Sequence, residues 1–130
     1  MTGNNIALDT SVVILHLRND KTITAKLQDT SSLFLPVIAM GELYYGAAMS
    51  ANPDMTTENL KLLFEIMIPL FPDQATAEYY GRIKRELARK GKPIPENDIW
   101  ISALAMQYEL PLAVRDTHFS QVDGLVVLNW

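Results

Sequence analysis

The stretch that decides the fold is Ile6-Ala7-Leu8-Asp9-Thr10-Ser11-Val12-Val13-Ile14. An apolar run ends in one aspartate, two hydroxyl residues follow, and a second apolar run begins. The pattern predicts a buried strand that ends at Leu8 and a helix after it, with Thr10 or Ser11 as the N-cap. Asp9 then lies at the carboxyl end of a strand, where open α/β sheets bind their ligands. A cap of the following helix is the alternative role for Asp9.

Composition limits the classes of protein and of metal site that the chain can form. With 130 residues, of which 48% are hydrophobic, we expect one globular domain over residues 1–130. No apolar run approaches the roughly 20 residues of a membrane span, so we expect no membrane partner. The chain has no cysteine, which excludes disulfides and fits a cytoplasmic location. His16 and His118 are its two imidazoles, so we expect a metal to be bound by oxygen, which favours Mg²⁺ or Mn²⁺.

Short apolar strands alternate with helical patterns along the chain. Strands are expected at 6–8, 31–35, 70–71, 112–114 and 125–128. Helices are expected at 11–19, 22–28, 37–49, 57–68, 73–89 and from Pro95 or Asn97 to 109, with a helical turn at 119–122. This alternation predicts the α/β class, with a short parallel sheet flanked by helices on both faces (α/β/α).

Two aspartates occupy equivalent places in this scheme. Leu112–Val114 is an apolar strand, and Asp116 follows it as Asp9 follows the first strand. Both aspartates are followed by a threonine. Because the carboxyl ends of parallel strands meet at one edge of the sheet, the two carboxylates can be neighbours.

Two further acids lie on predicted helices. Glu42 interrupts an apolar helix, and a buried unpaired carboxylate there would cost several kcal/mol, so it must meet a cation or face a cleft. A surface glutamate is the alternative for this residue. Asp98 lies in the first turn of its helix, where an acid also interacts favourably with the helix dipole. Glu96 competes with Asp98 for the same role, and spacing alone does not decide between them.

Several carboxylates around one crevice repel one another unless they share a cation. A divalent metal is therefore the simplest explanation for four such acids, and oxygen ligands select Mg²⁺ or Mn²⁺. Such a site can activate water and offset the charge of a phosphodiester. If the four acids converge, the chemistry is metal-dependent phosphoryl hydrolysis.

Basic residues gather in one segment of an otherwise acidic chain. The net charge is -4, yet six lysines and arginines fall between residues 82 and 92. This strip is a candidate for contact with phosphates, and a solvated helix face is the alternative. Its candidate contacts are Arg82, Lys84, Arg85 and Arg89.

Four motifs in this order resemble the PIN domain, and more narrowly the VapC-type toxins of toxin–antitoxin pairs. They are Leu8-Asp9-Thr10-Ser11, Gly41-Glu42-Leu43, the segment Pro95–Ala103 and the segment Arg115–Phe119. The segments 80–84, 91–94 and 122–128, with Trp130, are also typical of this family.

The resemblance implies a magnesium-dependent endoribonuclease whose four acids match Asp9, Glu42, Asp98 and Asp116. It also favours Asp98 over Glu96. In the family pattern Asp9 and Asp98 bind the metal, and Asp116 binds it directly or through water. Glu42 orients a metal-bound water or acts as a base. The remaining implied roles are hydrogen bonds to these acids from Thr10 and Thr117, and Mn²⁺ as a substitute for Mg²⁺.

The family resemblance also implies partners. VapC-type toxins form homodimers and are neutralised by a small VapB-like antitoxin, whose tail enters the acidic groove. Seven residues are candidates for the dimer or antitoxin surface, with ordinary core as their alternative: Tyr44, Tyr45, Met49, Leu60, Leu63, Phe64 and Met67.

Two other classes of function compete with the ribonuclease. A receiver-like phosphoacceptor domain also gathers acids at strand ends, but it needs a lysine at the end of a late strand, and this chain ends Leu128-Asn129-Trp130. A non-catalytic PIN-like binding module would hold a partner's arginine in the acidic groove and cleave no RNA.

Overall fold

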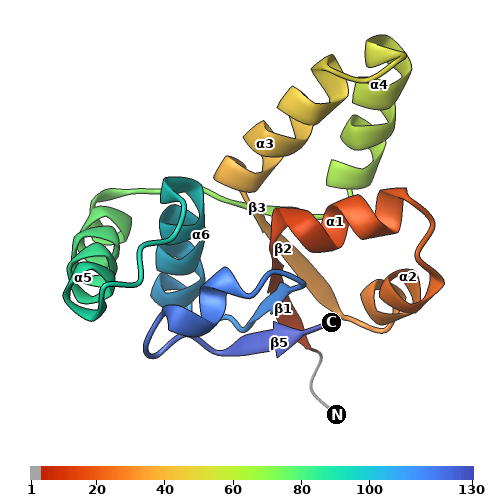
Figure 1. Cartoon of the computed structure of the whole chain (residues 1–130). Coiled ribbons are helices and arrows are strands. Elements are labelled where there is room, and N and C mark those ends of the chain that lie inside the picture. The colour runs from red at the N-terminus through yellow and green to blue at the C-terminus, as the bar shows by residue number, and fades with distance from the viewer. Residues whose placement is uncertain (1–3) are drawn as a thin grey trace.

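β1 (Asn5–Leu8) is the middle strand of a five-stranded sheet with the order β3-β2-β1-β4-β5. The computed structural model describes residues 4–130, so residues 1–3 of the expected domain lie outside the described part (Figure 1). All four pairs of neighbouring strands are parallel. The other strands are β2 (Ser32–Pro36), β3 (Ile68–Leu70), β4 (Leu112–Val114) and β5 (Val127–Asn129). The predicted parallel α/β sheet is confirmed.

In the described part of the chain, six α-helices surround this sheet. α1 and α2 lie on one side of it, α5 and α6 pack against each other on the other side, and α3 and α4 form a hairpin that extends beyond the sheet (Figure 1). Their bounds are α1 (Thr10–Leu17), α2 (Lys21–Gln28), α3 (Val37–Ala48), α4 (Pro53–Phe64), α5 (Gln74–Lys90) and α6 (Glu96–Gln107). A short 3-10 helix, η1 (His118–Gln121), precedes β5.

The order of the strands creates the crevice that the sequence predicts. The chain passes from β1 outward to β2 and β3, and then returns to place β4 on the opposite side of β1. The direction of strand addition therefore reverses between β1 and β4, and such a reversal leaves a crevice at the carboxyl ends of the two strands. Asp9 directly follows β1, and Asp116 lies two residues after β4.

Burial explains why β1 and β4 are so apolar. Ile6, Ala7 and Leu8 are buried, and every residue of β4 is fully buried, as expected for parallel strands covered by helices on both faces. A smaller apolar cluster joins α5 to α6 through Ile83, Leu87, Ile99 and Ala103, with Val122 beside them. The core around the sheet and the cluster between α5 and α6 together fix the strand ends and the start of α6 relative to each other.

Several predicted boundaries are wrong. Asp9 itself caps α1, with its carboxylate accepting the Ser11 N–H, so neither Thr10 nor Ser11 is the N-cap. The helix expected at 57–68 begins at Pro53 because Asn52 caps it, and it ends at Phe64. Residues 68–70 pair instead with β2, a long-range contact that the apolar pattern of the segment does not reveal. The last strand begins at Val127 rather than 125.

The remaining elements lie within about two residues of their predicted positions. Of the two candidate starts of α6, Pro95 is the N-cap. Along α3 the buried residues are Ala39, Leu43 and Ala47. No helix within residues 4–130 combines the length and apolar character that crossing a membrane requires. The cytoplasmic location stays a prediction.

Candidate active site

Asp9 is the most buried of the four acids, with 4% of its surface exposed. Its backbone is extended, so the carboxylate turns back over the first turn of α1 and accepts the Ser11 hydroxyl at 2.6 Å and the Ser11 N–H at 3.3 Å. Burial raises the pKa of Asp9 above its usual value, the bonds from Ser11 oppose this, and the negative charge of Asp116 adds to it. The carboxylate is held in one orientation in a place that penalises its charge.

Glu42 reaches the same region from α3. The Thr10 hydroxyl donates to Glu42 Oε1 at 3.0 Å, which ties α3 to the residue after Asp9. Burial raises the pKa of Glu42, and the charge of Asp9 adds to this, while the Thr10 hydroxyl and the Asn97 amide lower it. Glu42 also borders a surface hollow with Thr10, Ile38, Tyr45 and Asn97. It therefore faces a cleft, as its position in an apolar helix predicts.

Asp98 lies in the first turn of α6, and 13% of its side chain is exposed. Burial is the main reason that its pKa rises to about 6, and the charges of Asp9 and Asp116 add to this effect. The His118 ring opposes the rise because its Nδ1 lies 3.1 Å from Asp98 Oδ2. A carboxyl group with this pKa is half protonated near pH 6. Its raised affinity for a proton means that a cation that replaces the proton would stabilise the charged form.

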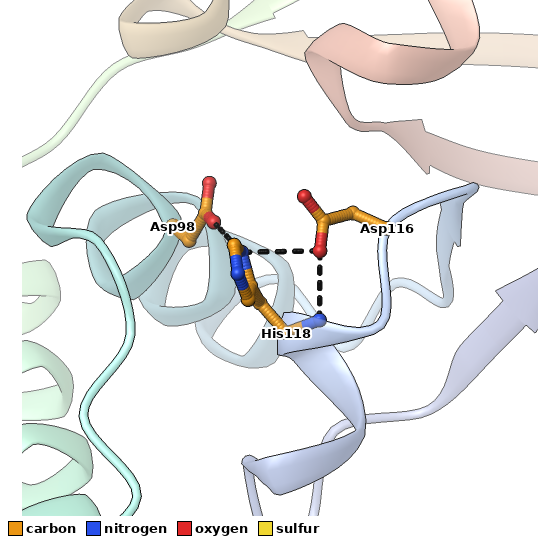
Figure 2. A group of neighbouring side chains, drawn as sticks. All are labelled: Asp98, Asp116 and His118. Atoms are coloured by element: carbon orange, nitrogen blue, oxygen red, sulfur yellow. Dashed lines mark hydrogen bonds and ion pairs between the residues drawn. The ribbon is translucent and has the colours of Figure 1, made fainter.

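Asp116 and His118 lie together on the turn between β4 and η1. Asp116 Oδ1 accepts the backbone N–H of His118 at 2.8 Å and lies 3.0 Å from its ring Nδ1 (Figure 2). The side chain of Phe119 is fully buried in the main core and anchors the turn. Each of the three side chains offers a ligand atom within 4.8 Å of the other two: Asp98, Asp116 and His118.

The structure brings the four predicted acids into one electrostatic group. Asp9 interacts by charge with Glu42, Asp98 and Asp116, and Asp98 with Asp116. Within residues 4–130, the set of ligand atoms close enough to share an ion contains Asp98 and Asp116 but lacks Asp9. Oxygen donors with raised proton affinity suit a divalent cation, so the residues present fit such an ion.

Two contributors were missed by the sequence reasoning. Ser11 holds Asp9, and His118 joins Asp98 to Asp116. A local signal for His118 exists, because an aspartate at a strand end commonly accepts the backbone N–H two residues later, which fixes the residue there. Thr117 is exposed, and its carbonyl oxygen accepts the Ser120 hydroxyl at 2.8 Å. A bond from the Thr117 hydroxyl to an acid stays a prediction.

Glu96, the competitor of Asp98, is engaged elsewhere. Its carboxylate accepts hydrogen bonds from the Lys84 ammonium and the Tyr80 hydroxyl on the exposed side of α5 and α6. The Lys84 and Tyr80 bonds lower the pKa of Glu96. Two residues of one helical turn therefore have opposite environments, and Asp98 is the one near Asp116.

The predicted basic strip divides over the surface of α5. Lys84 is paired with Glu96, next to the first turn of α6 that carries Asp98. Arg82 lies with its guanidinium carbon 4.7 Å from the centre of the Tyr79 ring, and like Arg89 it borders a hollow that contains Asp123. Arg85 is exposed. Lys84 is thus held by Glu96 on the exposed side of α5 and α6.

The candidate interaction surface divides into core and exposed parts. Leu60 and Met67 are buried, and Leu63 and Phe64 are partly buried against the core. Tyr45 and Met49, by contrast, are 70% and 71% exposed on α3.

Comparison with known proteins decides the family. The model of the PIN domain matches residues 6–125. The chain belongs to the PIN domain family. The PIN domain here is 32% identical over 126 residues to ribonuclease VapC2 of Haemophilus influenzae, covering 95% of this chain and 96% of that protein. It is 27% identical over 126 residues to the tRNA(fMet)-specific endonuclease VapC of Shigella flexneri, with coverage of 95% and 96%.

Solved structures agree with this assignment. The VapBC-1 structure from nontypeable Haemophilus influenzae superposes on this PIN domain with a TM-score of 0.88 at 27% identity, covering 97% of this chain and 98% of that one. The predicted resemblance to the VapC type of PIN domain is confirmed.

Proposed function

We propose that this PIN domain is a metal-dependent endoribonuclease and the toxin of a toxin–antitoxin pair. One observation carries the proposal. Carboxylates from the residue after β1, from α3, from α6 and from the turn after β4 lie close enough to interact by charge, and three of them, Asp9, Glu42 and Asp98, have raised pKa values. The names of the VapC relatives, ribonuclease and endonuclease, support the same activity.

The residues of the site have distinct roles in this proposal. Asp9, Asp98 and Asp116 hold a divalent ion, Mg²⁺ or Mn²⁺, which when bound activates water and offsets the charge of the phosphodiester. Glu42 orients the attacking water or accepts its proton, and its raised pKa suits a base. Ser11 and Thr10 keep the Asp9 and Glu42 carboxylates in place.

The proposed partners are RNA, an antitoxin and a second copy of the chain. The Shigella relative is named for its action on tRNA, so tRNA is the first substrate to test. The proposed phosphate contacts are Lys84, which is paired with Glu96 beside the start of α6, and Arg82, Arg85 and Arg89 on the same strip. The VapBC-1 neighbour supports an antitoxin. Exposed Tyr45 and Met49 on α3 are candidates for the antitoxin or dimer contact.

The test is cleavage of total RNA and of tRNA by the purified chain, in Mg²⁺, in Mn²⁺ or in EDTA. We expect cuts that require the metal and that disappear in Asp9→Asn and Asp98→Asn while the circular dichroism spectrum stays native. Glu96→Gln is the matched control, since it removes a carboxylate from the same turn of α6 but from the exposed pair with Lys84.

The outcomes separate the alternatives. Near-normal cleavage by Asp9→Asn would contradict the proposed site. Absence of cleavage by the folded, antitoxin-free protein in either metal would contradict the ribonuclease proposal and favour a binding module that uses the groove for a partner's arginine.

A further inference from the structure

His118 occupies a position between two proposed metal ligands. Its Nδ1 atom lies 3.1 Å from Asp98 Oδ2 and 3.0 Å from Asp116 Oδ1 (Figure 2). One ring nitrogen carries at most one hydrogen, so it can offer only a shared hydrogen bond to these two carboxylates. A cation among the three atoms would bind all of them at once.

The spacing of these atoms matches an octahedral ion. Ligands at about 2.1 Å from such an ion lie about 3.0 Å apart when adjacent and about 4.2 Å apart when opposite. Both nitrogen-to-oxygen distances agree with adjacent positions, and all three atoms lie within 4.8 Å of one another. The third distance, between the two carboxylate oxygens, is at most 4.8 Å, and an ion requires it to be about 4.2 Å or less.

The fold holds His118 in this position. The backbone N–H of His118 donates to Asp116 Oδ1 at 2.8 Å, which closes the turn. The next residue, Phe119, is fully buried in the core. These contacts fix the backbone of His118 beside Asp98 and Asp116, and the ring is oriented by its own contacts at 3.1 and 3.0 Å with the two carboxylates. A ligand whose backbone is already placed loses less freedom when it binds.

From this geometry we propose that His118 Nδ1 is a direct metal ligand beside Asp98 and Asp116, and that it makes the site prefer Mn²⁺ over Mg²⁺. An imidazole nitrogen binds transition ions well, whereas Mg²⁺ strongly favours oxygen. The inference rests on the proposed function, because it assumes that the acidic site binds a divalent ion. It extends that proposal by naming a nitrogen ligand and the ion that the ligand selects.

The experiment measures metal binding, independently of RNA cleavage. Titration calorimetry at pH 7.5 gives the Kd of Mn²⁺ and of Mg²⁺, and pulsed electron paramagnetic resonance of the Mn²⁺-loaded protein detects a directly bound ¹⁴N nucleus. We expect the wild-type protein to bind Mn²⁺ at least tenfold more tightly than Mg²⁺ and to show the nitrogen coupling. His118→Ala should lose the coupling and about tenfold in Mn²⁺ affinity, with less than a threefold change for Mg²⁺.

Two variants keep the test decisive. His118→Gln retains a side chain that can hydrogen-bond to both carboxylates but removes the imidazole, so it should lose the nitrogen coupling as His118→Ala does. His16→Ala removes the other imidazole, whose Nδ1 lies 2.8 Å from Thr24 Oγ1 on α2, and it should behave as wild type.

Each result has one meaning. Mn²⁺ binding without nitrogen coupling, or an unchanged preference for Mn²⁺ in His118→Gln, would overturn the role of His118 while leaving the ribonuclease proposal in place. If the folded wild-type protein bound neither ion, the metal site on which the proposed function depends would itself be wrong.

Discussion

Replacement of Asp98 by asparagine should make the protein more stable at neutral pH. The carboxyl group of Asp98 has a pKa of about 6 in the fold, against 3.8 for an ordinary aspartate, chiefly because it is buried. The folded state therefore holds the proton more tightly than the unfolded chain does. The contribution of Asp98 to stability is fully present at low pH, where the group is protonated in both states, and it is lost as pH rises from about 4 to about 6.

The size of the effect follows from the difference in pKa. About two units at 1.36 kcal/mol per unit give about 3 kcal/mol as an upper value. Because 13% of the Asp98 side chain is exposed and water screens part of the charge, we expect about 2 kcal/mol above pH 7. For 130 residues, the usual unfolding entropy converts this to a rise in Tm of about 7 °C.

The assay is urea and thermal unfolding of the wild-type protein and Asp98→Asn in EDTA, from pH 4 to 8. Asparagine keeps the shape and an acceptor for His118, so the comparison isolates the charge. The advantage of the variant should be small near pH 4, grow to pH 6 and stay constant above pH 7. Equal or lower stability of Asp98→Asn at pH 7.5 would refute the reasoning.

Glu96→Gln supplies a control with the opposite sign. Its carboxylate is paired with Lys84 and Tyr80, which lower its pKa. A carboxyl group whose pKa is lower in the folded state than in the unfolded chain stabilises the fold at pH values above its unfolded pKa. That stabilisation is lost as pH falls through the folded pKa. Glu96→Gln should therefore be less stable than wild type at pH 7.5, with the difference shrinking in acid. A stabilised Glu96→Gln would show that loss of any negative charge explains the Asp98 result.

Three further predictions test the contacts around the site and the helix ends. Ser11→Ala removes the hydroxyl that binds Asp9 at 2.6 Å, so kcat/KM for RNA should fall about tenfold, and an unchanged value would contradict the positioning role. Glu109 has φ +54°, a conformation that glycine adopts without strain, so Glu109→Gly should stabilise the fold by up to about 1 kcal/mol in urea unfolding. Gly91 has φ +66°, so Gly91→Ala should destabilise the fold by about 1 kcal/mol. Changes in stability of the same sign for the two variants would contradict this backbone account. Phe119→Ala should cost about 3 kcal/mol in urea, and a cost below 1 kcal/mol would mean that Phe119 does not anchor the turn.

The architecture could be predicted because its causes are local. Apolar residues alternate with polar helix caps along the chain, and this pattern repeats at Leu8-Asp9 and at Val114-Arg115-Asp116. Parallel strands place their carboxyl ends at one edge, so the strand assignments alone put Asp9 and Asp116 at the same edge of the sheet. Their neighbourhood follows from the pairing of β4 with β1.

The end of α4 could not be predicted in this way. The apolar residues of the segment 57–68 fit a helix throughout, but the structure ends the helix at Phe64 and pairs residues 68–70 with β2. The hydrogen bonds that make this choice join residues more than 30 positions apart. Periodicity within a window of a dozen residues does not contain them.

The choice between Glu96 and Asp98 also depends on packing. Glu96 and Asp98 both lie in the first turn of α6, and their positions in the sequence allow either of them to be the acid of the site. Ile99 and Ala103 pack against α5, and this contact rotates α6 so that Asp98 faces Asp116 while Glu96 faces Lys84. The family resemblance favoured Asp98, but the rotation of the helix supplies the physical reason.

The sequence by itself determined the α/β class, the strand that carries Asp9 and the acids available for a metal, because apolar periodicity and residue chemistry are properties of the chain. Only the tertiary structure decided which side chains surround Asp98. Its neighbours Asp116 and His118 are 18 and 20 residues away and arrive through the packing of η1 against α6. A raised pKa and a nitrogen among oxygen ligands arise from that juxtaposition, since burial and distance between charges exist only once the chain has folded.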